Sequence, residues 1–282
     1  MKLDVVWNCH GDFEKDYIVN DLLSKFDVTV HESKNDVFID NALIVYGYDS
    51  PIITNEFSRF LEEYSNKNLA YGLMHLSNER LGHKFDYYSN AKYTLRTYLD
   101  PRIPTDLAYT FPIGYRSGHA DLKPTSYDSK EYDFCFAGQP KNDRGELINV
   151  MSKHNSFVHT TRGFFCNSRL EVPQYQKVMS ASKFVPCPMG NVNPETFRLF
   201  ESLQSGSIPV LKRYSNPEYY EKLLGDHPIP IIDSWQELPS LLTIYQGDSY
   251  QNKIDELVDW YYNTKNRISE DVLEIVKHCN HG

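Results

Sequence analysis

The stretch that decides the fold is SASKFVPCPMGNVNPETFRLFESLQSGSIPVL, residues 180–211. Its apolar run KFVPCP predicts a buried strand, a glycine-containing loop follows, and SIPVL predicts a second strand. Asn193 is a good helix N-cap, Pro194 suits a first helical turn, and Gly206 suits the left-handed residue that follows a helix. We therefore predict a strand, a loop, a helix over residues 194–205, and a strand.

The predicted helix has two different faces. At 100° per residue its leucines and phenylalanines gather on one side, whereas Glu195, Arg198 and Glu201 fall on the other. A stripe of this kind is common on solvent-exposed helices as i, i+3 ion pairs. The preceding loop, with Gly190 and Asn191, can approach a ligand closely, and the unpaired amides of a helix start attract anions. The segment predicts a site for a phosphorylated ligand, with a plain surface helix as the alternative.

Composition limits the class of protein. The chain has 282 residues, 40% hydrophobic and 24% charged, which is enough for two domains of roughly 100 to 150 residues. A net charge of −9 and the lack of a Lys/Arg-rich run argue against a nucleic-acid partner. Five cysteines without C-x-x-C spacing predict free thiols in a reducing compartment. The apolar run in MKLDVVWNCHGD is too short for a signal peptide or a membrane span, so we expect a cytoplasmic protein.

Short apolar runs alternate with helical segments along the chain, which is typical of α/β folds with parallel sheets. Residues 112–132 turn to Gly, Ser, Pro, Asp and Lys, as in a linker. We place two Rossmann-like, doubly wound α/β domains at residues 1–121 and 122–282. The last helices are expected to begin near Tyr250 and Ile268, and the final one is a candidate to pack back on the first domain.

Residues 197–211, FRLFESLQSGSIPVL, with Phe184, Pro186 and Gly190 upstream, resemble the C-terminal signature of exostosin-like glycosyltransferases. In that family an Arg and a Glu share the helix, and a G-x-I-P-V strand follows. The resemblance implies the glycosyltransferase B (GT-B) architecture, in which two Rossmann-like domains face each other across a cleft. Because this chain shows no membrane anchor, the resemblance fits a bacterial or large-virus (chlorovirus-like) enzyme.

The resemblance implies that the second domain binds a nucleotide sugar. In FAGQPKNDRGELI, Gly138 directly follows a strand and Arg144 begins a helix, the geometry of a phosphate-facing loop, and the segment resembles the F-x-G element of the family. An exposed capping arginine is the alternative for Arg144. The chain has no D-x-D motif to hold a metal against the diphosphate, so we expect arginines and helix amides to bind it without metal or cofactor. The predicted donor-binding residues are Gly138, Arg144, Gly190, Asn191, Glu195, Thr196, Arg198 and Glu201.

Two loops of the first domain offer a general base for the acceptor hydroxyl. HLSNE, after a predicted strand, resembles the H-x-x-D-E element of the family, with Asn in the Asp position and Glu79 retained. Glu79 is the first candidate for the base, and Asp12, in NCHGDFEKDY, is the second. An exposed acid in a turn is the alternative for Glu79, and His10 is equally a candidate for donor phosphate or for packing. The predicted acceptor-binding residues are His10, His75 and Tyr115.

For Glu201 the resemblance implies binding of ribose hydroxyls, and an ion pair with Arg198 is the plain alternative. Together these features predict an inverting, metal-independent glycosyltransferase that moves a sugar from a nucleotide sugar to an oligosaccharide or glycoprotein glycan. A UDP-sugar is the default donor by family habit, and xylose is a guess. A two-domain sugar-nucleotide epimerase or isomerase and a noncatalytic carbohydrate-binding protein are the alternatives.

Overall fold

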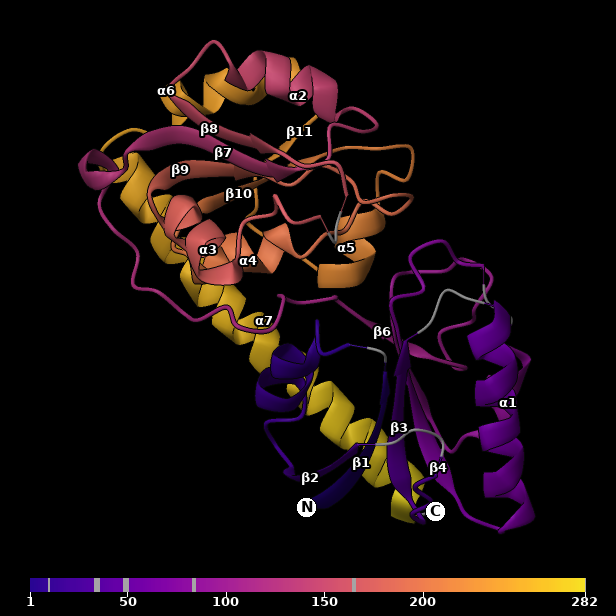
Figure 1. Ribbon diagram of the computed structural model, residues 1–282. Coiled ribbons are helices and arrows are strands. Elements are labelled where there is room, and N and C mark those ends of the chain that lie inside the picture. Colours follow the sequence, from indigo (N-terminus) through magenta and orange to yellow (C-terminus); the bar gives the residue numbers. More distant parts are fainter. Residues whose placement is uncertain (10, 33–35, 48–50, 83–84, 164–165, 282) are drawn as a thin grey trace. The chain divides into compact units, whose positions relative to one another are not determined.

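Both halves of the chain fold around a parallel β-sheet, as the ribbon in Figure 1 shows. The computed structural model describes residues 1–281 apart from 10, 33–35, 48–50, 83–84 and 164–165. Its residues form two compact units. Unit 1 is Met1–Ile113 with Lys265–Gly282, and unit 2 is Gly114–Thr264. The expected class, two α/β units built on parallel sheets, is confirmed.

Unit 1 holds a six-stranded sheet in the order β2-β1-β3-β4-β5-β6, and every pair is parallel. Its strands are β1 (Lys2–Cys9), β2 (Asp27–Glu32), β3 (Ala42–Gly47), β4 (Tyr71–Leu76), β5 (Thr94–Thr97) and β6 (Tyr109–Phe111). The central strands β3 and β4 are mostly apolar and are buried along almost their whole length, because helices cover a parallel sheet on its faces. Its helices are η1 (Tyr17–Leu22), α1 (Pro51–Asn66) and η2 (Asp86–Asn90).

Helix α1 packs on this sheet through an apolar stripe. Phe57, Phe60, Leu61 and Tyr64 recur at helical spacing and join Ile44 of β3 in one buried cluster. This packing fixes the position of the strands whose carboxyl ends carry the candidate residues of unit 1.

Unit 2 holds a five-stranded parallel sheet in the order β11-β10-β9-β7-β8. Its strands are β7 (Tyr132–Gly138), β8 (Ser156–Thr160), β9 (Ser182–Pro186), β10 (Ile208–Lys212) and β11 (Ile231–Ile232). Its helices are η3 (Tyr127–Ser129), α2 (Arg144–Met151), α3 (Val172–Ser180), α4 (Arg198–Gln204), α5 (Tyr219–Leu224), η4 (Trp235–Ser240), α6 (Leu241–Ile244) and the first part of α7 (Asp248–His281).

Helix α4 ends as the sequence predicts but begins later. Gly206 has φ +66°, and the amides of Gly206 and Ser207 donate to the carbonyls of Leu203 and Ser202, which is a Schellman motif. The predicted start at Pro194 is wrong, because the helix begins at Arg198.

The late start has a local cause. The carbonyl of Asn193 accepts from the amide of Gly190 (2.8 Å), and that of Pro194 accepts from the Tyr220 hydroxyl (2.9 Å). A helix that started at Pro194 would need both carbonyls as acceptors for its own amides. Each of them instead accepts a hydrogen bond from another group. Asn193 is not its N-cap, and α4 is too short for its amides alone to form an anion site.

The units divide at residues 113 and 114, ahead of the 121/122 boundary placed from composition. Residues after Gly114 pack into unit 2, where Tyr115 and His119 are buried and the Leu122 amide donates to the Gln204 carbonyl (2.7 Å). Glycine and proline in this stretch therefore mark an irregular but packed segment.

Helix α7 is continuous over 34 residues, where two separate helices were expected. No Gly or Pro interrupts it. Its residues from Lys265 onward belong to unit 1, where Ser269 Oγ lies 3.1 Å from Ser24 Oγ and Tyr109 donates to Asp271 (2.8 Å).

Candidate functional site

The candidate site of unit 2 lies at the carboxyl ends of β7 and β9, which are neighbours in the sheet. Ligands of open parallel sheets bind at this edge, in the loops that follow the strands. The loop over residues 139–143 leads from β7 into α2, and the loop over residues 187–197 leads from β9 into α4. The second loop carries four of the eight predicted donor-binding residues, and the other four lie at the end of β7, at the start of α2 and within α4.

The two loops are tied to each other by side chains. The Asn142 amide donates to the carbonyl of Gly190 (3.0 Å), and Lys141 donates to the Asn191 side chain. The turn itself is closed by the bond from the Gly190 amide to the Asn193 carbonyl (2.8 Å). Gly190 and Asn191 are therefore brought beside the β7 loop.

Arg144 is the first residue of α2, and its guanidinium spans both loops. Nη2 donates to the carbonyl of Met189 (2.6 Å), and Nη1 donates to that of Gln139 (3.3 Å). The guanidinium lies 5.9 Å from the centre of the Phe136 ring, and the side chain is buried. The alternative of an exposed capping arginine is therefore wrong.

Arg198 approaches the same place from the start of α4. Its Nη2 donates to the carbonyl of Ala137 (2.7 Å), and its guanidinium lies 5.0 Å from the centre of the Phe136 ring. Burial alone would lower the pKa of Arg198, but Tyr175 and Glu201 outweigh it, and the pKa is raised. Arg198 therefore stays cationic at the end of β7.

The two guanidinium groups converge over Gly138. A Cβ atom built on Gly138 would lie 2.7 Å from Nη2 of Arg198 and 3.7 Å from Nη1 of Arg144. The φ of Gly138 is +154°, so a side chain is disfavoured there for two reasons. Two like charges that share the end of one strand repel each other unless an anion lies between them. The arrangement is suited to a diphosphate.

Glu201, one helical turn after Arg198, is buried and engaged. Its Oε1 lies 3.5 Å from Nε2 of His119, and the main-chain amide of Arg116 donates to its carboxylate. Burial raises the pKa of Glu201, with Arg198 and Arg116 opposing. Burial, with a smaller contribution from Arg116, lowers the pKa of His119 to about 4, so His119 is neutral at pH 7. Sequence reasoning missed His119, because a lone histidine in a polar stretch carries no signal.

Glu195 and Thr196 lie in the loop before α4 instead of on its exposed face. Glu195 is 2% exposed and accepts from the Tyr219 hydroxyl at 3.4 Å. Thr196 is half-buried, and its hydroxyl has no hydrogen-bond partner among the described residues. The predicted stripe of Glu195 with Arg198 and Glu201 is therefore wrong for Glu195, since the helix begins after it.

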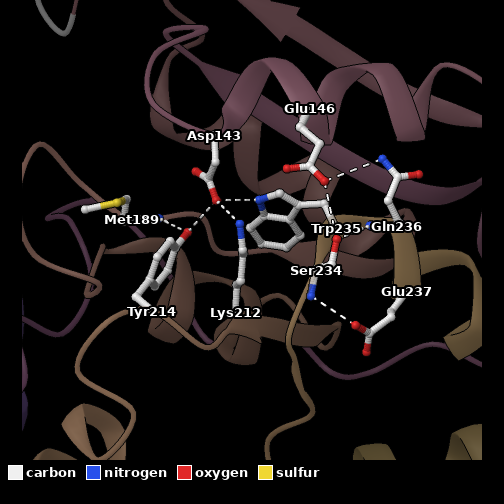
Figure 2. Close-up of polar contacts among 9 residues, drawn as sticks. All are labelled: Asp143, Glu146, Met189, Lys212, Tyr214, Ser234, Trp235, Gln236 and Glu237. Atoms are coloured by element: carbon white, nitrogen blue, oxygen red, sulfur yellow. Dashed lines mark hydrogen bonds and ion pairs between the residues drawn. The ribbon is translucent and has the colours of Figure 1, made fainter.

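Asp143 is the centre of a polar network behind the site, drawn in Figure 2. Its Oδ2 accepts from Lys212 (2.9 Å), the Tyr214 hydroxyl (3.1 Å) and the Trp235 indole (2.7 Å). The same Tyr214 oxygen accepts from the Met189 amide at 2.9 Å. We call these five residues the Asp143 network. It joins the loop that leads into Arg144 to Met189, whose carbonyl accepts a hydrogen bond from Arg144.

A second contact holds η4 against α2. Ser234 Oγ donates to Glu146 at 3.3 Å, as Figure 2 shows. Ser234 and Glu237 form a capping box at the start of η4, with the Ser234 amide donating to Glu237 at 3.1 Å. The β7 loop is therefore supported from two sides.

The candidate bases lie in unit 1. Glu79 is half-buried in the turn after β4. The Asp12 side chain, after β1, is 66% exposed and lies 3.6 Å from Lys15. Strand β3 lies between β1 and β4, so these two acids follow strands that are not neighbours. The structure does not group them into one pair.

The predicted acceptor-binding residues His75 and Tyr115 belong to different units. His75 is 1% exposed within β4, where its ring stacks on Tyr46 (4.3 Å) and its Nδ1 lies 2.5 Å from the Tyr88 hydroxyl. Tyr115 is buried and belongs to unit 2, whereas the sequence placed it in the first domain. His10 lies outside the described residues. His75 packs within the sheet, and its role in acceptor binding stays a prediction.

Among the described residues, no group of three His, Cys, Asp or Glu side chains is placed to hold a metal ion. None of the helices in the described ranges is both long enough and apolar enough to cross a bilayer.

The fold, two α/β units built on parallel sheets, is similar to that of GT-B glycosyltransferases. A crystal structure of an α1,3-fucosyltransferase superimposes with a TM-score of 0.59, covers 100% of this chain and 90% of its own, and is 13% identical. Anabaena HepE in complex with UDP gives a TM-score of 0.52, covers 99% of this chain and 100% of its own, and is 10% identical. At these identities the likeness concerns the fold.

Residues 118–279, more than half of the chain, match the RXYLT1 C-terminal domain, and the chain belongs to that family. Ribitol-5-phosphate xylosyltransferase 1 of Danio rerio is 28% identical over 153 residues, which are 48% of this chain and 35% of the relative. The chain thus spans about a third of the length of this curated relative. The matched family region includes all the donor-side candidates.

Proposed function

We propose that this protein is a glycosyltransferase that moves a sugar from a nucleotide sugar to a hydroxyl acceptor. The observation that carries the proposal is the convergence of Arg144 and Arg198 over Gly138. The family match and the GT-B fold support it. We also propose that the likeness of FRLFESLQSGSIPVL to exostosin-like enzymes reflects a shared donor site.

The diphosphate of the donor lies between the two guanidinium groups, which take the place of a metal in stabilising the leaving group. The loop at Gly190 and Asn191 borders the sugar, and Glu201 accepts hydrogen bonds from the ribose hydroxyls. Its buried carboxylate is directed by the Arg116 amide. UDP is the proposed nucleotide, since HepE was solved with UDP, and xylose the proposed sugar, since the relative is named a xylosyltransferase.

The reaction proceeds by a single in-line displacement with inversion, which requires one base and no covalent intermediate. Glu79 is the proposed base, and Asp12 is the second candidate. The acceptor is a glycan hydroxyl, and the name of the relative points to one that carries a polyol phosphate.

A donor panel tests the proposal. The full chain is incubated in EDTA with UDP- and GDP-sugars and a phosphorylated polyol glycan, and release of nucleoside diphosphate is followed. We expect one of the donors to release its nucleoside diphosphate as its sugar, xylose or another, is transferred to the acceptor. Binding without release would instead favour a carbohydrate-binding protein, and conversion of the donor without acceptor would favour an epimerase. No binding of any nucleoside diphosphate contradicts the proposal.

Glu79→Gln supplies the test of the base. Removing a general base lowers turnover by about 100- to 10,000-fold while donor affinity stays unchanged. The matched control is Glu62→Gln, an exposed acid of α1. Unchanged turnover in Glu79→Gln removes it as the base.

A further inference from the structure

The carboxyl edge of the unit 1 sheet has its own row of polar side chains. Tyr46, His75 and Arg96 are the penultimate residues of β3, β4 and β5, and they lie side by side in register. Ligands of parallel sheets bind at this edge. The proposed mechanism uses none of the three.

Arg96 is almost completely enclosed, with 1% of its surface exposed. Its Nε donates to the main-chain carbonyls of Thr97 (3.3 Å) and Tyr98 (3.1 Å). Its terminal nitrogens Nη1 and Nη2 make no hydrogen bond of normal geometry in the described part of the chain, and the Tyr88 hydroxyl is the polar group that interacts with the guanidinium. These two atoms carry four N–H donors, and leaving buried donors of a charged group unfilled is strongly unfavourable.

The nearest acid is already engaged. Asp100, whose side chain is 1% exposed, accepts from Arg102 through both oxygens, with Nε at 2.9 Å and Nη2 at 2.6 Å. The Arg102 amide adds a third bond to it at 3.0 Å. Asp100 therefore has a bidentate partner of its own, and it fills none of the terminal donors of Arg96.

The other polar groups near Arg96 are neutral. The Tyr88 hydroxyl lies 2.5 Å from His75 Nδ1, and Tyr46 and Tyr87 hydroxyls lie 2.7 Å apart. Burial raises the pKa of Tyr88 to about 12, with the charge of Arg96 opposing it. Apart from Asp100, the surroundings are thus hydroxyls and an imidazole, which can donate or accept hydrogen bonds but carry no opposite charge.

The backbone around this edge is unusual. Ser77 and Leu81, after β4, have φ values of 60° and 52°, and Tyr98, after β5, has φ 62°. Left-handed backbone is rare for residues other than glycine and asparagine, and it recurs at ligand sites. The Leu81 carbonyl accepts from Arg102, which links this strained turn to Asp100.

We propose that the terminal nitrogens of Arg96 bind a phosphate group of the acceptor at the carboxyl edge of the unit 1 sheet. A planar guanidinium fork matches two phosphate oxygens. The phosphate also supplies the negative charge that the neutral side chains around Arg96 do not. Because Arg96 is enclosed, binding displaces the residues packed on it. Assigning the phosphate to the acceptor rests on the proposed function, whereas the anion site itself does not.

The test is a titration of the intact protein with inorganic phosphate, observed through ¹⁵N-labelled arginine side chains. Arg96→Lys identifies the Arg96 signal by its loss. We expect this signal to shift with phosphate and not with acetate. A phosphate titration that leaves the Arg96 signal unmoved overturns the proposal.

Arg96→Gln gives the second measurement, since its amide can still donate to the main-chain carbonyls. Affinity for ribitol 5-phosphate should fall about tenfold to a hundredfold, while that for ribitol stays the same. The matched control Arg198→Gln, in unit 2, should leave the Arg96 signal and its response unchanged. Equal ribitol 5-phosphate affinity in wild type and Arg96→Gln contradicts the proposal. If no nucleoside diphosphate binds unit 2 while Arg96 responds to phosphate, the proposed function fails and this site stands.

Discussion

Each unit carries buried arginine at the carboxyl edge of its parallel sheet, but the two edges hold it differently. In unit 2, Arg144 and Arg198 donate to main-chain carbonyls, and the Asp143 network braces the loops around them. In unit 1, Arg96 donates through Nε, and its terminal nitrogens make no hydrogen bond of normal geometry among the described residues. The guanidinium groups of the first edge are already held by main-chain carbonyls, whereas under our proposal that of the second is completed by a bound phosphate.

This difference suits two kinds of ligand. A nucleoside diphosphate is the constant part of a donor, so a rigid site binds it without loss of affinity to reordering. An acceptor varies more, and in the proposed function it is bound by the edge that adjusts. The predictions below test whether the two edges differ in this way.

The largest effect is expected from Arg198→Met, which removes one guanidinium from the rigid edge. The affinity for nucleoside diphosphate should fall about 100-fold, which corresponds to about 3 kcal/mol, because charge-assisted bonds to phosphate are lost. Calorimetric titration measures it. Arg213→Met, which removes an exposed arginine paired with Asp233 at 3.0 Å, is the control and should bind normally. If both variants lost the same affinity for nucleoside diphosphate, binding would depend on the net charge of the protein and not on the position of Arg198.

The next effect is the pH dependence of unit 2. The folded-state pKa of His119, about 4, lies below its ordinary value of 6.5, so the unfolded chain takes up the proton first. Stability is therefore fully present above about pH 6.5 and is lost as the pH falls toward 4, by about 2 kcal/mol between pH 7 and pH 5. Urea unfolding at several pH values measures this loss.

His119→Asn is the comparison for that measurement. Glu201, whose raised pKa acts in the opposite sense on acidification, is present in both proteins, so the difference between the two curves isolates His119. Parallel curves would show that His119 is not buried in its neutral form.

The smallest effect is expected from Tyr214→Phe, which breaks the Asp143 network at one hydroxyl. The Met189 amide loses its partner, and the carbonyl that orients Arg144 is less well fixed. Affinity for diphosphate should fall about tenfold. Tyr250→Phe removes another hydroxyl of unit 2, bound to the Lys183 carbonyl at 3.2 Å, and should lower the melting temperature similarly without affecting binding. If Tyr214→Phe binds diphosphate as tightly as the wild type, the Asp143 network stabilises the fold but does not support diphosphate binding.

Much of the fold follows from the sequence because it rests on local patterns. Apolar runs locate the central strands, and Gly206 marks the end of α4, since a left-handed position after a helix favours glycine. The start of α4 could not be predicted. It is set by bonds from Gly190 and from Tyr220, which lies 26 positions from Pro194.

The candidate site shows the same limit. Gly138, Arg144 and Arg198 could be predicted because the sequence places all three close to the end of a strand or the start of a helix; in the structure Gly138 ends β7, and the two arginines begin α2 and α4. The Asp143 network was missed because its members come from separate elements, and Trp235 lies 92 positions from Asp143. The state of the Arg96 terminal nitrogens could not be predicted either, because it depends on residues of β4 and η2 that lie apart from it in the sequence.

The measurement that tests the central claim most directly is a titration of UDP into the wild-type protein in EDTA, followed through ¹⁵N-labelled arginine side chains. The account predicts that the signals of Arg144 and Arg198 shift together and saturate at one equivalent, with Arg213 unaffected. Saturable binding that leaves both signals unmoved, or no binding of UDP or GDP at all, would contradict it.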